Sequence, residues 1–359
     1  MRTLVVLDER WNSALTDLGL KVASVLRGEV AVAAIPGFPA YERAEELQLH
    51  RLPISDPRKG LPIKAFFTLK KALENFRPQV VITIRGDEML FAALLKKRFN
   101  YKLYRIHGQA KGVRVSFLNK WLHENFLDGV ILTSRKFLNE VVYGLRRLIV
   151  PGMVDAEKFN FSLDRRERWR AHFGVSPTEP LIGMVARFDP VKGHDLLFKA
   201  LARLKSKKWK LAVVGREENV SLSQLRSQVK ALGLEGRVFF IAKKLEDLPG
   251  FMSACDLAVA PSLGSEVVVR APLEFMACQT CVVATEVGAL PEVVSPPFGR
   301  VVPPKEKELA LAINSFLKRG VPTLRKLGRF AREVTVERYS VKALTPVIND
   351  FFSYELRNP

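Results

Sequence analysis

The sequence predicts an α/β protein with two doubly wound domains, each a parallel sheet covered by helices. Short apolar, β-branched runs alternate with helical patterns along the whole chain, which is the order of a parallel sheet with crossover helices. The runs lack the polar alternation of half-exposed strands, so we expect them to be buried on both faces. A chain of 359 residues is long enough for two domains of ordinary size.

Ten runs are expected to form strands, five in each half of the chain. They are residues 4–7, 30–35, 80–84, 102–106 and 130–133, and then 181–185, 210–214, 238–241, 257–260 and 282–284. A helix is expected at 64–76, where Phe66, Leu69, Leu73 and Phe76 fall on one stripe.

A linker is indicated by the turn residues Val150-Pro151-Gly152. We therefore expect an N-terminal domain at 1–160 and a second domain at 161–335. Ligands of open parallel sheets bind beyond the carboxyl ends of the strands, which predicts a site in the cleft between the two domains.

The chain is strongly basic, with 57 Lys and Arg against 37 Asp and Glu, a net charge of +20 and a pI near 10.0. Residues 58–120 alone contain 15 basic and 3 acidic residues. Such an excess predicts an anionic partner, which could be nucleic acid, a phosphorylated substrate or an acidic membrane surface.

Several classes of protein are excluded by the apolar runs and the cysteines. No run approaches the roughly 18–20 residues of a membrane-spanning helix. The N-terminal apolar run ends at Asp8 and is too short for a signal peptide, so a cytoplasmic location is expected. Cys278 and Cys281 form a Cys-x-x-Cys pair, but only Cys255 remains to complete a zinc site, and we expect buried structural thiols.

A cationic loop follows the expected strand at 181–185. It carries Arg187 and Lys192, and a helix is expected to begin at Asp195. Two cations beside the free N–H groups of a helix start favour a phosphate or diphosphate site. On spacing alone, two solvent-exposed loop cations remain the alternative.

Two carboxylates and a glycine follow the next strands. Glu266 comes after 257–260, and Glu274 lies eight residues later in a helix expected at 267–279, a separation that returns to the same helical face. Paired carboxylates accept hydrogen bonds from sugar hydroxyls; one capping and one exposed glutamate is the alternative. Gly288, after the strand at 282–284, permits close backbone approach.

Taken in order, the Arg…Lys loop, the Glu-x7-Glu pair and the Val-Gly-x-x-Pro-Glu turn resemble the nucleotide-sugar domain of retaining GT-B glycosyltransferases of family 4. That family includes bacterial mannosyltransferases and lipopolysaccharide-core glucosyltransferases. The resemblance extends over residues 100–345, with 127–134 similar to the last N-domain strand and 331–340 similar to the start of the closing helix. It implies two Rossmann-like domains, and a C-terminal helix at 336–359 that packs back toward the N-terminal domain.

The resemblance also implies roles for individual residues. Arg187, Lys192 and Gly288 would hold the donor diphosphate, and Glu274 would hold the ribose. Glu266 would contact the donor sugar, and His107 occupies the place where the family often has a histidine near the reacting sugar. His107 and Glu266 are therefore the catalytic candidates. The nucleotide sugar is a substrate, so no cofactor is expected.

The chain departs from the family pattern in three places. Val267-Val268-Val269-Arg270 stands where the family often has Gly-aromatic-Gly, and Gln279-Thr280-Cys281 replaces Gly-x-Pro. The first loop, residues 8–12, lacks the usual paired glycines. These departures leave the donor sugar and the way the acceptor is held unspecified.

The resemblance implies a transfer with retention of the anomeric configuration. No Asp-x-Asp pair follows a strand, so a metal-independent reaction is expected. No nucleophilic carboxylate is identified, so departure and attack on the same face of the sugar are expected. A sugar-nucleotide epimerase would need a cluster of acids and histidine in the cleft, and the sequence indicates none. A nicotinamide oxidoreductase would need Gly-x-Gly-x-x-Gly after the first strand, and the first loop lacks it. A non-catalytic nucleic-acid-binding protein would need aromatics among basic residues. Residues 101–105 fit that pattern weakly and are better explained as a strand, so nucleic acid is not an expected partner.

Two basic helices predict a membrane surface as a partner. Lys64, Lys70 and Lys71 flank the aromatic stripe, and the next helix ends in Lys96, Lys97 and Arg98. Apolar stripes flanked by basic residues suit an anionic bilayer; the alternative is that Phe66 and Phe76 are core residues. We expect a peripheral enzyme on the inner face of the cytoplasmic membrane, with an anionic, lipid-linked acceptor such as a lipopolysaccharide core.

Overall fold

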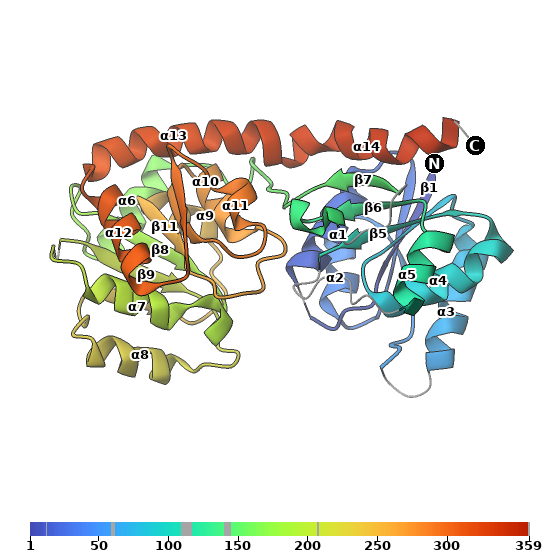
Figure 1. Ribbon diagram of the computed structural model, residues 1–359, viewed down its shortest axis with the longest axis horizontal. Coiled ribbons are helices and arrows are strands. Elements are labelled where there is room, and N and C mark those ends of the chain that lie inside the picture. Colours follow the sequence, from blue (N-terminus) through green and yellow to red (C-terminus); the bar gives the residue numbers. More distant parts are fainter. Residues whose placement is uncertain (12, 59–61, 109–116, 140–144, 207, 358–359) are drawn as a thin grey trace. The chain divides into compact units, whose positions relative to one another are not determined.

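The computed structural model describes residues 1–11, 13–58, 62–108, 117–139, 145–206 and 208–357. It divides into two compact units, the first made of Met1–Met153 with Leu344–Pro359 and the second of Val154–Ala343. Each unit contains one parallel sheet with helices packed against it (Figure 1). The two doubly wound sheets that the sequence predicts are therefore present.

The first unit has a seven-stranded sheet in the order β3-β2-β1-β4-β5-β6-β7. Its elements are β1 Arg2–Leu7, α1 Ala14–Val25, β2 Glu29–Ala34, α2 Pro39–Glu46, β3 His50–Pro53, α3 Pro62–Phe76, β4 Val80–Thr83, α4 Gly86–Phe99, β5 Lys102–His107, α5 Phe117–Phe126, β6 Gly129–Leu132, the 3₁₀ turn Arg135–Asn139, β7 Arg146–Ile149, and most of α14 Val341–Arg357. In the register of the sheet, Leu4 lies between Ala31 of β2 and Val81 of β4.

The second unit has a six-stranded sheet in the order β10-β9-β8-β11-β12-β13. Its elements are α6 Leu163–His172, β8 Leu181–Val185, the 3₁₀ turn Pro190–Lys192, α7 His194–Ala202, β9 Lys210–Val214, α8 Leu222–Ala231, β10 Val238–Ile241, α9 Leu248–Ala254, β11 Leu257–Ala260, α10 Ala271–Ala277, β12 Cys281–Thr285, α11 Leu290–Val293, β13 Gly299–Val302, α12 Glu306–Leu317 and α13 Gly320–Tyr339. In this sheet Ala258 lies between Val282 and Gly183.

Each sheet reverses its direction of winding at one place. The strand order turns between β1 and β4 in the first unit and between β8 and β11 in the second. Ligands of doubly wound folds bind outside the carboxyl ends of the strands at this switch point. The residues that follow these four strands are therefore the first places to look for a site.

A buried ion-pair cluster holds β8 and β11 together at their amino ends. Asp256 Oδ1 lies 2.6 Å from Arg166 Nη2, and Asp256 Oδ2 lies 2.9 Å from Arg170 Nη1. The Leu181 N–H donates to the same Oδ2 at 2.9 Å. Removing one partner of such a buried pair costs about 3–5 kcal/mol, so this cluster fixes the relative position of the two strands at the switch point.

Three strands lie outside the sequence predictions: β3, β7 and β13, which are edge strands. Edge strands are partly exposed and tolerate charges, so they lack a continuous apolar run. β7 illustrates this, because it reads Arg-Arg-Leu-Ile and all four residues are only partly buried.

The predicted start of the helix at 267–279 is wrong, because α10 begins at Ala271. The residues before it are the β-branched run Val267-Val268-Val269, which favours extended backbone, and Ser265 has a positive φ of 61°. Glu266 and Glu274 consequently do not share a helical face.

The stripe on α3 faces the core of the first unit. Leu69, Leu73 and Phe76 are buried, and Phe66 packs against the same cluster. The prediction that this stripe meets a membrane is therefore wrong, and the alternative that these are core residues holds. The prediction of buried thiols is confirmed, because Cys255, Cys278 and Cys281 are all fully buried.

The last helix, α14, packs on the first unit. Phe352 and Phe351 make edge contacts with Tyr104 of β5 at centroid distances of 4.8 and 5.6 Å. Asn349 Nδ2 donates to the Val25 carbonyl at 2.8 Å. These contacts return the end of the chain to the unit in which it starts.

Candidate functional site

The loop after β8 and the loop after β11 are hydrogen-bonded to each other at the switch point of the second unit. The Leu263 N–H donates to the Val191 carbonyl at 2.8 Å. Gly193 has φ of 73°, and a Cβ there would lie 1.9 Å from the Pro261 carbonyl oxygen. This position accepts only glycine, and the close approach holds the cationic loop beside the exit of β11.

Lys192 and Glu266 are brought together by this arrangement. Lys192 Nζ lies 2.5 Å from Glu266 Oε1, and Ser262 Oγ donates to the same oxygen at 2.6 Å. Both charged side chains are mostly buried, at 18% and 11% exposure. The cation predicted to hold phosphate and the carboxylate predicted to touch sugar are therefore direct neighbours.

Arg187 is oriented by a second carboxylate. Its Nη2 lies 3.3 Å from Asp189 Oδ2, which also accepts from Asn219 Nδ2 at 2.8 Å. The Val191 N–H donates to Asp189 Oδ1 at 2.9 Å. Burial alone would raise the pKa of Asp189, but these hydrogen bonds and the nearby cations lower it below its ordinary value. Asp189 thus stays ionised and holds the loop that carries Arg187.

Gly288 meets the backbone of Glu266. It has φ of 59°, and a Cβ there would lie 2.0 Å from the Glu266 carbonyl oxygen. The next residue, Ala289, donates its N–H to that oxygen at 2.8 Å. The glycine therefore lets the turn after β12 hold Glu266 in place, which is a structural reason for it besides the predicted contact with diphosphate.

Glu274 lies in the first turn of α10 and is 7% exposed. It belongs to the same unit as Arg187, Lys192 and Glu266, but it stands on a helix and Glu266 stands on a loop. The two carboxylates are therefore positioned by separate elements.

His107 belongs to the first unit, where it ends β5. It is 1% exposed, and its ring makes an edge contact with Phe137 at 5.1 Å. Burial, with smaller effects from Arg105 and His123, lowers the pKa of His107 to about 3. At neutral pH this imidazole is uncharged, so it offers one donor and one acceptor nitrogen. Residues 109–116, which follow His107 and Gly108, lie outside the described residues.

A third buried histidine, His194, begins α7 beside the cationic loop. Burial lowers its pKa from 6.5 to about 4. The unfolded chain therefore binds this proton more readily, and the stability that the neutral ring confers is present above pH 6.5 and is lost as the pH falls toward 4. The full shift corresponds to about 3 kcal/mol.

We expect His194→Gln to make the free energy of unfolding less dependent on pH below pH 6.5. Between pH 6.5 and 4, the free energy of unfolding from urea titrations should fall less steeply in the variant than in the wild type. His172→Gln is the control, because His172 is exposed at the end of α6, and the slope should stay unchanged. Parallel profiles for wild type and His194→Gln would contradict the assignment.

The predicted basic residues of the first unit differ in their surroundings. Lys96 Nζ lies 2.6 Å from both Asp128 Oδ2 and the Phe126 carbonyl oxygen, so it holds α4 to the loop before β6. Lys70 lies 3.6 Å from Glu74 on the same helix. Lys64, Lys71, Lys97 and Arg98 are exposed.

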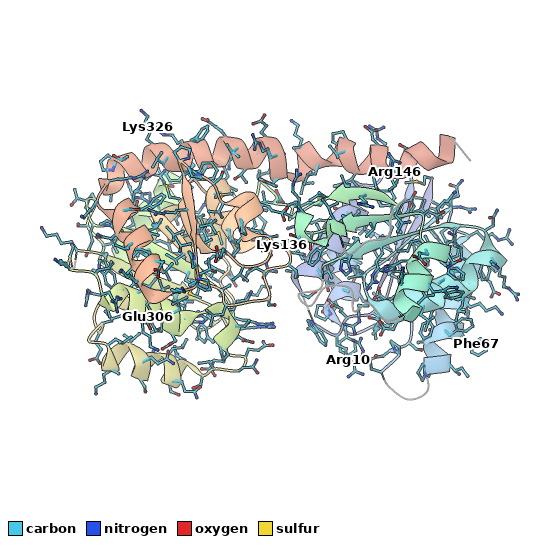
Figure 2. The ribbon with its side chains drawn as sticks, viewed as in Figure 1. Arg10, Phe67, Lys136, Arg146, Glu306 and Lys326 are labelled. Carbon is cyan, nitrogen blue, oxygen red and sulfur yellow. The ribbon has the colours of Figure 1, made fainter. Side chains whose placement is uncertain are left out.

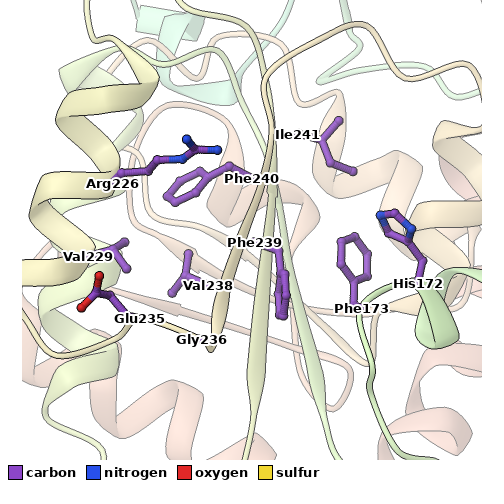
Figure 3. Close-up of a pocket in the computed structure, with 10 residues that line it drawn as sticks. All are labelled: His172, Phe173, Arg226, Val229, Glu235, Gly236, Val238, Phe239, Phe240 and Ile241. Atoms are coloured by element: carbon purple, nitrogen blue, oxygen red, sulfur yellow. The ribbon is translucent and has the colours of Figure 1, made fainter.

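A groove of about 440 Å³ lies elsewhere in the second unit. It lies at the edge strand β10, two strands away from β8 (Figure 3). Phe173, Phe239, Arg226 and Glu235 line it. None of the predicted site residues contributes to it.

Comparison with known proteins identifies the class of the second unit. Residues 165–334 match the family model described as glycosyl transferases group 1, so this unit carries a group 1 glycosyltransferase domain. The family resemblance predicted from the motifs is confirmed there.

Particular relatives extend this result. The lipopolysaccharide core biosynthesis mannosyltransferase LpsB of Rhizobium meliloti (strain 1021) is 31% identical over 216 residues, 59% of this chain and 60% of that protein. The D-inositol 3-phosphate glycosyltransferase of Mycobacterium sp. (strain KMS) is 33% identical over 172 residues, 46% of this chain and 38% of that protein. The chain thus matches about three fifths of the first relative's length and less than half of the second's.

A solved structure covers the whole chain. Anabaena HepE, determined in complex with UDP, aligns with a TM-score of 0.86 and 20% identity over 100% of both chains. This likeness shows the fold, which is GT-B, as the resemblance implies.

Sequence reasoning missed three residues that shape this site: Ser262, Asp189 and Asn219. Ser262 directly follows Pro261 at the exit of β11, so its position at a strand end was the available signal. Asn219 carried no signal, because its contact with Asp189 depends on how the loop after β9 folds back.

Proposed function

We propose that this protein is a retaining, metal-independent glycosyltransferase that moves a sugar from a nucleotide-diphosphate sugar to an anionic, lipid-linked acceptor. The observation that carries the proposal is the placement of Arg187 and Lys192 at the switch point of the group 1 domain, beside Glu266. HepE, whose fold is shared, was solved with UDP, which supports a nucleoside diphosphate as a ligand of this protein.

The two cations would stabilise the leaving diphosphate. As the glycosidic bond breaks, negative charge grows on the phosphate, and positioned cations act where that charge develops. Lys192 would move from Glu266 to the phosphate, and Glu266 would then be released to accept hydrogen bonds from the donor sugar. Ser262 would keep the Glu266 carboxylate in place after Lys192 leaves. Glu274 would accept hydrogen bonds from the ribose hydroxyls.

Retention follows from departure and attack on the same face of the sugar. In this scheme the leaving phosphate takes the acceptor proton, and the two cations balance its charge. The uncharged His107 would donate a hydrogen bond rather than a positive charge near the reacting sugar. No cofactor takes part.

The net charge of the chain and the names of two relatives support the proposed acceptor. LpsB is named for lipopolysaccharide core biosynthesis, and the mycobacterial relative for an inositol phosphate. Both names describe acceptors that carry phosphate or belong to a lipid, which fits a chain of net charge +20. In the described residues no helix is both long and apolar enough to span a bilayer. From the net charge of +20 we propose peripheral attachment to the inner face of the cytoplasmic membrane.

The membrane contact is proposed for a surface on α3 and α4, made of Ile63, Lys64, Phe67, Lys71, Leu94, Lys97 and Arg98. Ile63, Phe67 and Leu94 are 62%, 57% and 58% exposed (Figure 2 labels Phe67). The two helices touch through Phe66 and Phe91, whose centroids lie 5.9 Å apart. This α3–α4 surface, rather than the core-facing stripe, places apolar and basic side chains together.

We expect vesicle binding to depend on the α3–α4 surface. Each basic residue near an anionic bilayer contributes about 1 kcal/mol, so the triple variant Lys64→Glu, Lys71→Glu, Lys97→Glu should lose co-sedimentation with phosphatidylglycerol vesicles at low salt. The control reverses three exposed lysines of the second unit, Lys307, Lys318 and Lys326, and should still bind. Equal loss in both variants, or equal binding of wild type to neutral vesicles, would contradict the proposal.

The catalytic proposal is tested by donor turnover. Wild-type protein, treated with EDTA, is incubated with UDP-, GDP- and ADP-sugars and a lipid-extract acceptor, and the released nucleoside diphosphate is measured. We expect release with at least one donor in EDTA and an unchanged anomeric configuration in the product by NMR. Turnover that requires a divalent metal, or inversion at the anomeric carbon, would refute that part of the mechanism.

A further inference from the structure

One of the four edge strands lacks the residues that keep a sheet edge from pairing. The edges are β3 and β7 in the first unit and β10 and β13 in the second. Three of them carry a charge or a proline: Arg51 and Pro53 in β3, Arg146 and Arg147 in β7, and Arg300 in β13. β10 reads Val-Phe-Phe-Ile, and all four of its residues are only partly buried. An uncharged, apolar edge is a template for pairing with another strand.

The outer side of β10 carries unpaired backbone groups. The Ile241 carbonyl oxygen accepts from the Gly215 N–H, so the backbone of Ile241 faces β9. Because successive peptide groups of a strand point to opposite sides, Val238 and Phe240 direct their N–H and C=O groups away from β9. Among the described residues, β9 is the only strand that pairs with β10. Val238 and Phe240 can therefore donate to and accept from a further strand.

The groove at β10 gives such a strand access to this edge. Phe239 and Phe173 line the groove on one face of β10, while Phe240 and Arg226 line it on the other (Figure 3). Aromatic side chains thus flank the free backbone edge on both faces, an arrangement suited to recognition by strand addition. A small molecule in the groove is the alternative, but it would leave the backbone groups of Val238 and Phe240 unpaired.

The charges at the two ends of β10 are opposite in sign. Glu235 lies in the turn before the strand, and Lys243 and Lys244 lie shortly after it. All three side chains are exposed, and within the described part of the chain none of them forms an ion pair. An antiparallel copy of the same strand brings the acidic end of each chain to the basic end of the other, and a twofold axis makes this contact twice. An unrelated acidic peptide would attract the two lysines but would be repelled by Glu235.

We propose that β10 pairs antiparallel with β10 of a second copy of this chain about a twofold axis, so that two six-stranded sheets become continuous. Two registers keep the outward-facing residues in hydrogen-bonding positions, one centred on Phe239 and one centred on Phe240. Centring on Phe240 sets Arg237 opposite Lys243 of the partner subunit, and like charges directly opposite destabilise a pair of strands. Centring on Phe239 brings Glu235 toward that lysine instead and sets the two Phe239 rings opposite each other, so this register is the one assigned.

The expected dimer is weak. A contact confined to one strand edge and the side chains beside it falls at the small end of specific interfaces, for which a micromolar Kd is expected. The net charge of +20 on each chain also opposes association. At an ionic strength of about 0.15 M the Debye length is about 8 Å, so this repulsion is limited to charges near the contact.

Sedimentation velocity of the full chain at about 1–100 µM and about 0.15 M ionic strength tests the pairing. The sedimentation coefficient of the wild type should rise with concentration to that of a dimer. Glu235→Lys and Lys243→Glu should each raise the dimer Kd at least about fivefold, because each change places like charges together at both ends of the contact. The double variant Glu235→Lys, Lys243→Glu restores opposite charges, so its Kd should return to within about twofold of the wild-type value.

Val238→Pro tests the backbone contact. The Val238 N–H points away from β9, and an edge strand tolerates proline at its first residue, so the change should abolish the dimer and leave the pairing with β9 intact. Val238→Thr keeps both the N–H and the β-branched shape, so this control should still dimerise.

Three results would overturn the pairing: a wild type that stays monomeric at every concentration, an unchanged Kd in Lys243→Glu, or no recovery in the double variant. Glu235 and Lys243 are exposed, so these charge variants decide the question even if Val238→Pro does not fold. Donor turnover does not enter the test, and its result is therefore independent of the proposed function.

Discussion

Lys192→Ala and Arg187→Ala are each expected to lower kcat/KM for donor turnover by about 10²–10³-fold. Each change removes a cation from the place where charge develops on the leaving phosphate, and one such contact contributes about 2.7–4 kcal/mol to the transition state. We expect the larger effect for Lys192, because Glu266 fixes its position, with Nζ 2.5 Å from Glu266 Oε1. The measurement is initial rate of nucleoside diphosphate release.

Lys199→Ala is the matched control for these variants. Lys199 lies on α7, directly after the cationic loop, and pairs with Asp195 at 2.8 Å while 44% exposed. It should turn over donor at the wild-type rate. All three variants should remain folded, because none of the changed side chains belongs to a hydrophobic core cluster of the second unit. Wild-type turnover in both Lys192→Ala and Arg187→Ala would refute the diphosphate assignment.

Glu266→Gln is expected to separate binding from transfer. The amide keeps the hydrogen bond from Ser262 but no longer attracts Lys192, which becomes available to phosphate. Nucleoside diphosphate should bind about fivefold more tightly, the equivalent of about 1 kcal/mol. Sugar transfer should nevertheless fall by about 10²-fold, because the carboxylate no longer accepts from the donor sugar.

Calorimetry with the free nucleoside diphosphate distinguishes the two glutamates. Glu274→Gln should weaken that binding if Glu274 holds the ribose, opposite in sign to Glu266→Gln. Glu286→Gln changes an exposed carboxylate after β12 and should leave both binding and transfer unchanged. The same direction of change in Glu266→Gln and Glu274→Gln would contradict the division of roles.

The parts of the fold that the sequence predicted are those whose signal is local. The ten predicted strands are continuous apolar runs, and the structure contains a strand at each of them. The expected burial on both faces is wrong for β10, an edge strand whose residues are only partly buried. The edge strand β7 was missed because an edge accepts Arg146 and Arg147, which no apolar pattern reveals. The start of α10 was missed because the apolar pattern extends through Val267-Val268-Val269, although the β-branched run precedes the helix and α10 begins only at Ala271.

The site was predictable where motif and strand end coincide. Arg187, Lys192 and Glu266 follow β8 and β11, so their proximity is a consequence of strand order. The contact between Lys192 and Glu266 was not predictable, because it depends on the close approach of Gly193 to Pro261 and of Gly288 to Glu266. The ion pair between Asp8 and Arg85, whose atoms Oδ1 and Nε lie 3.1 Å apart, was missed for a related reason, because the two residues are distant in the sequence and meet only when β1 pairs with β4.

The central claim is that the second unit binds a nucleoside diphosphate at Arg187 and Lys192. A thermal-shift screen of the wild-type chain across UDP, GDP, ADP, CDP and dTDP tests it most directly, with inorganic diphosphate as the control for charge alone. A ligand at a hundredfold excess over its Kd stabilises the native state by about 2.7 kcal/mol. We predict a rise in Tm with at least one nucleoside diphosphate that is larger than the rise with inorganic diphosphate and is absent in Lys192→Ala. No rise with any of the five at millimolar concentration would contradict the account.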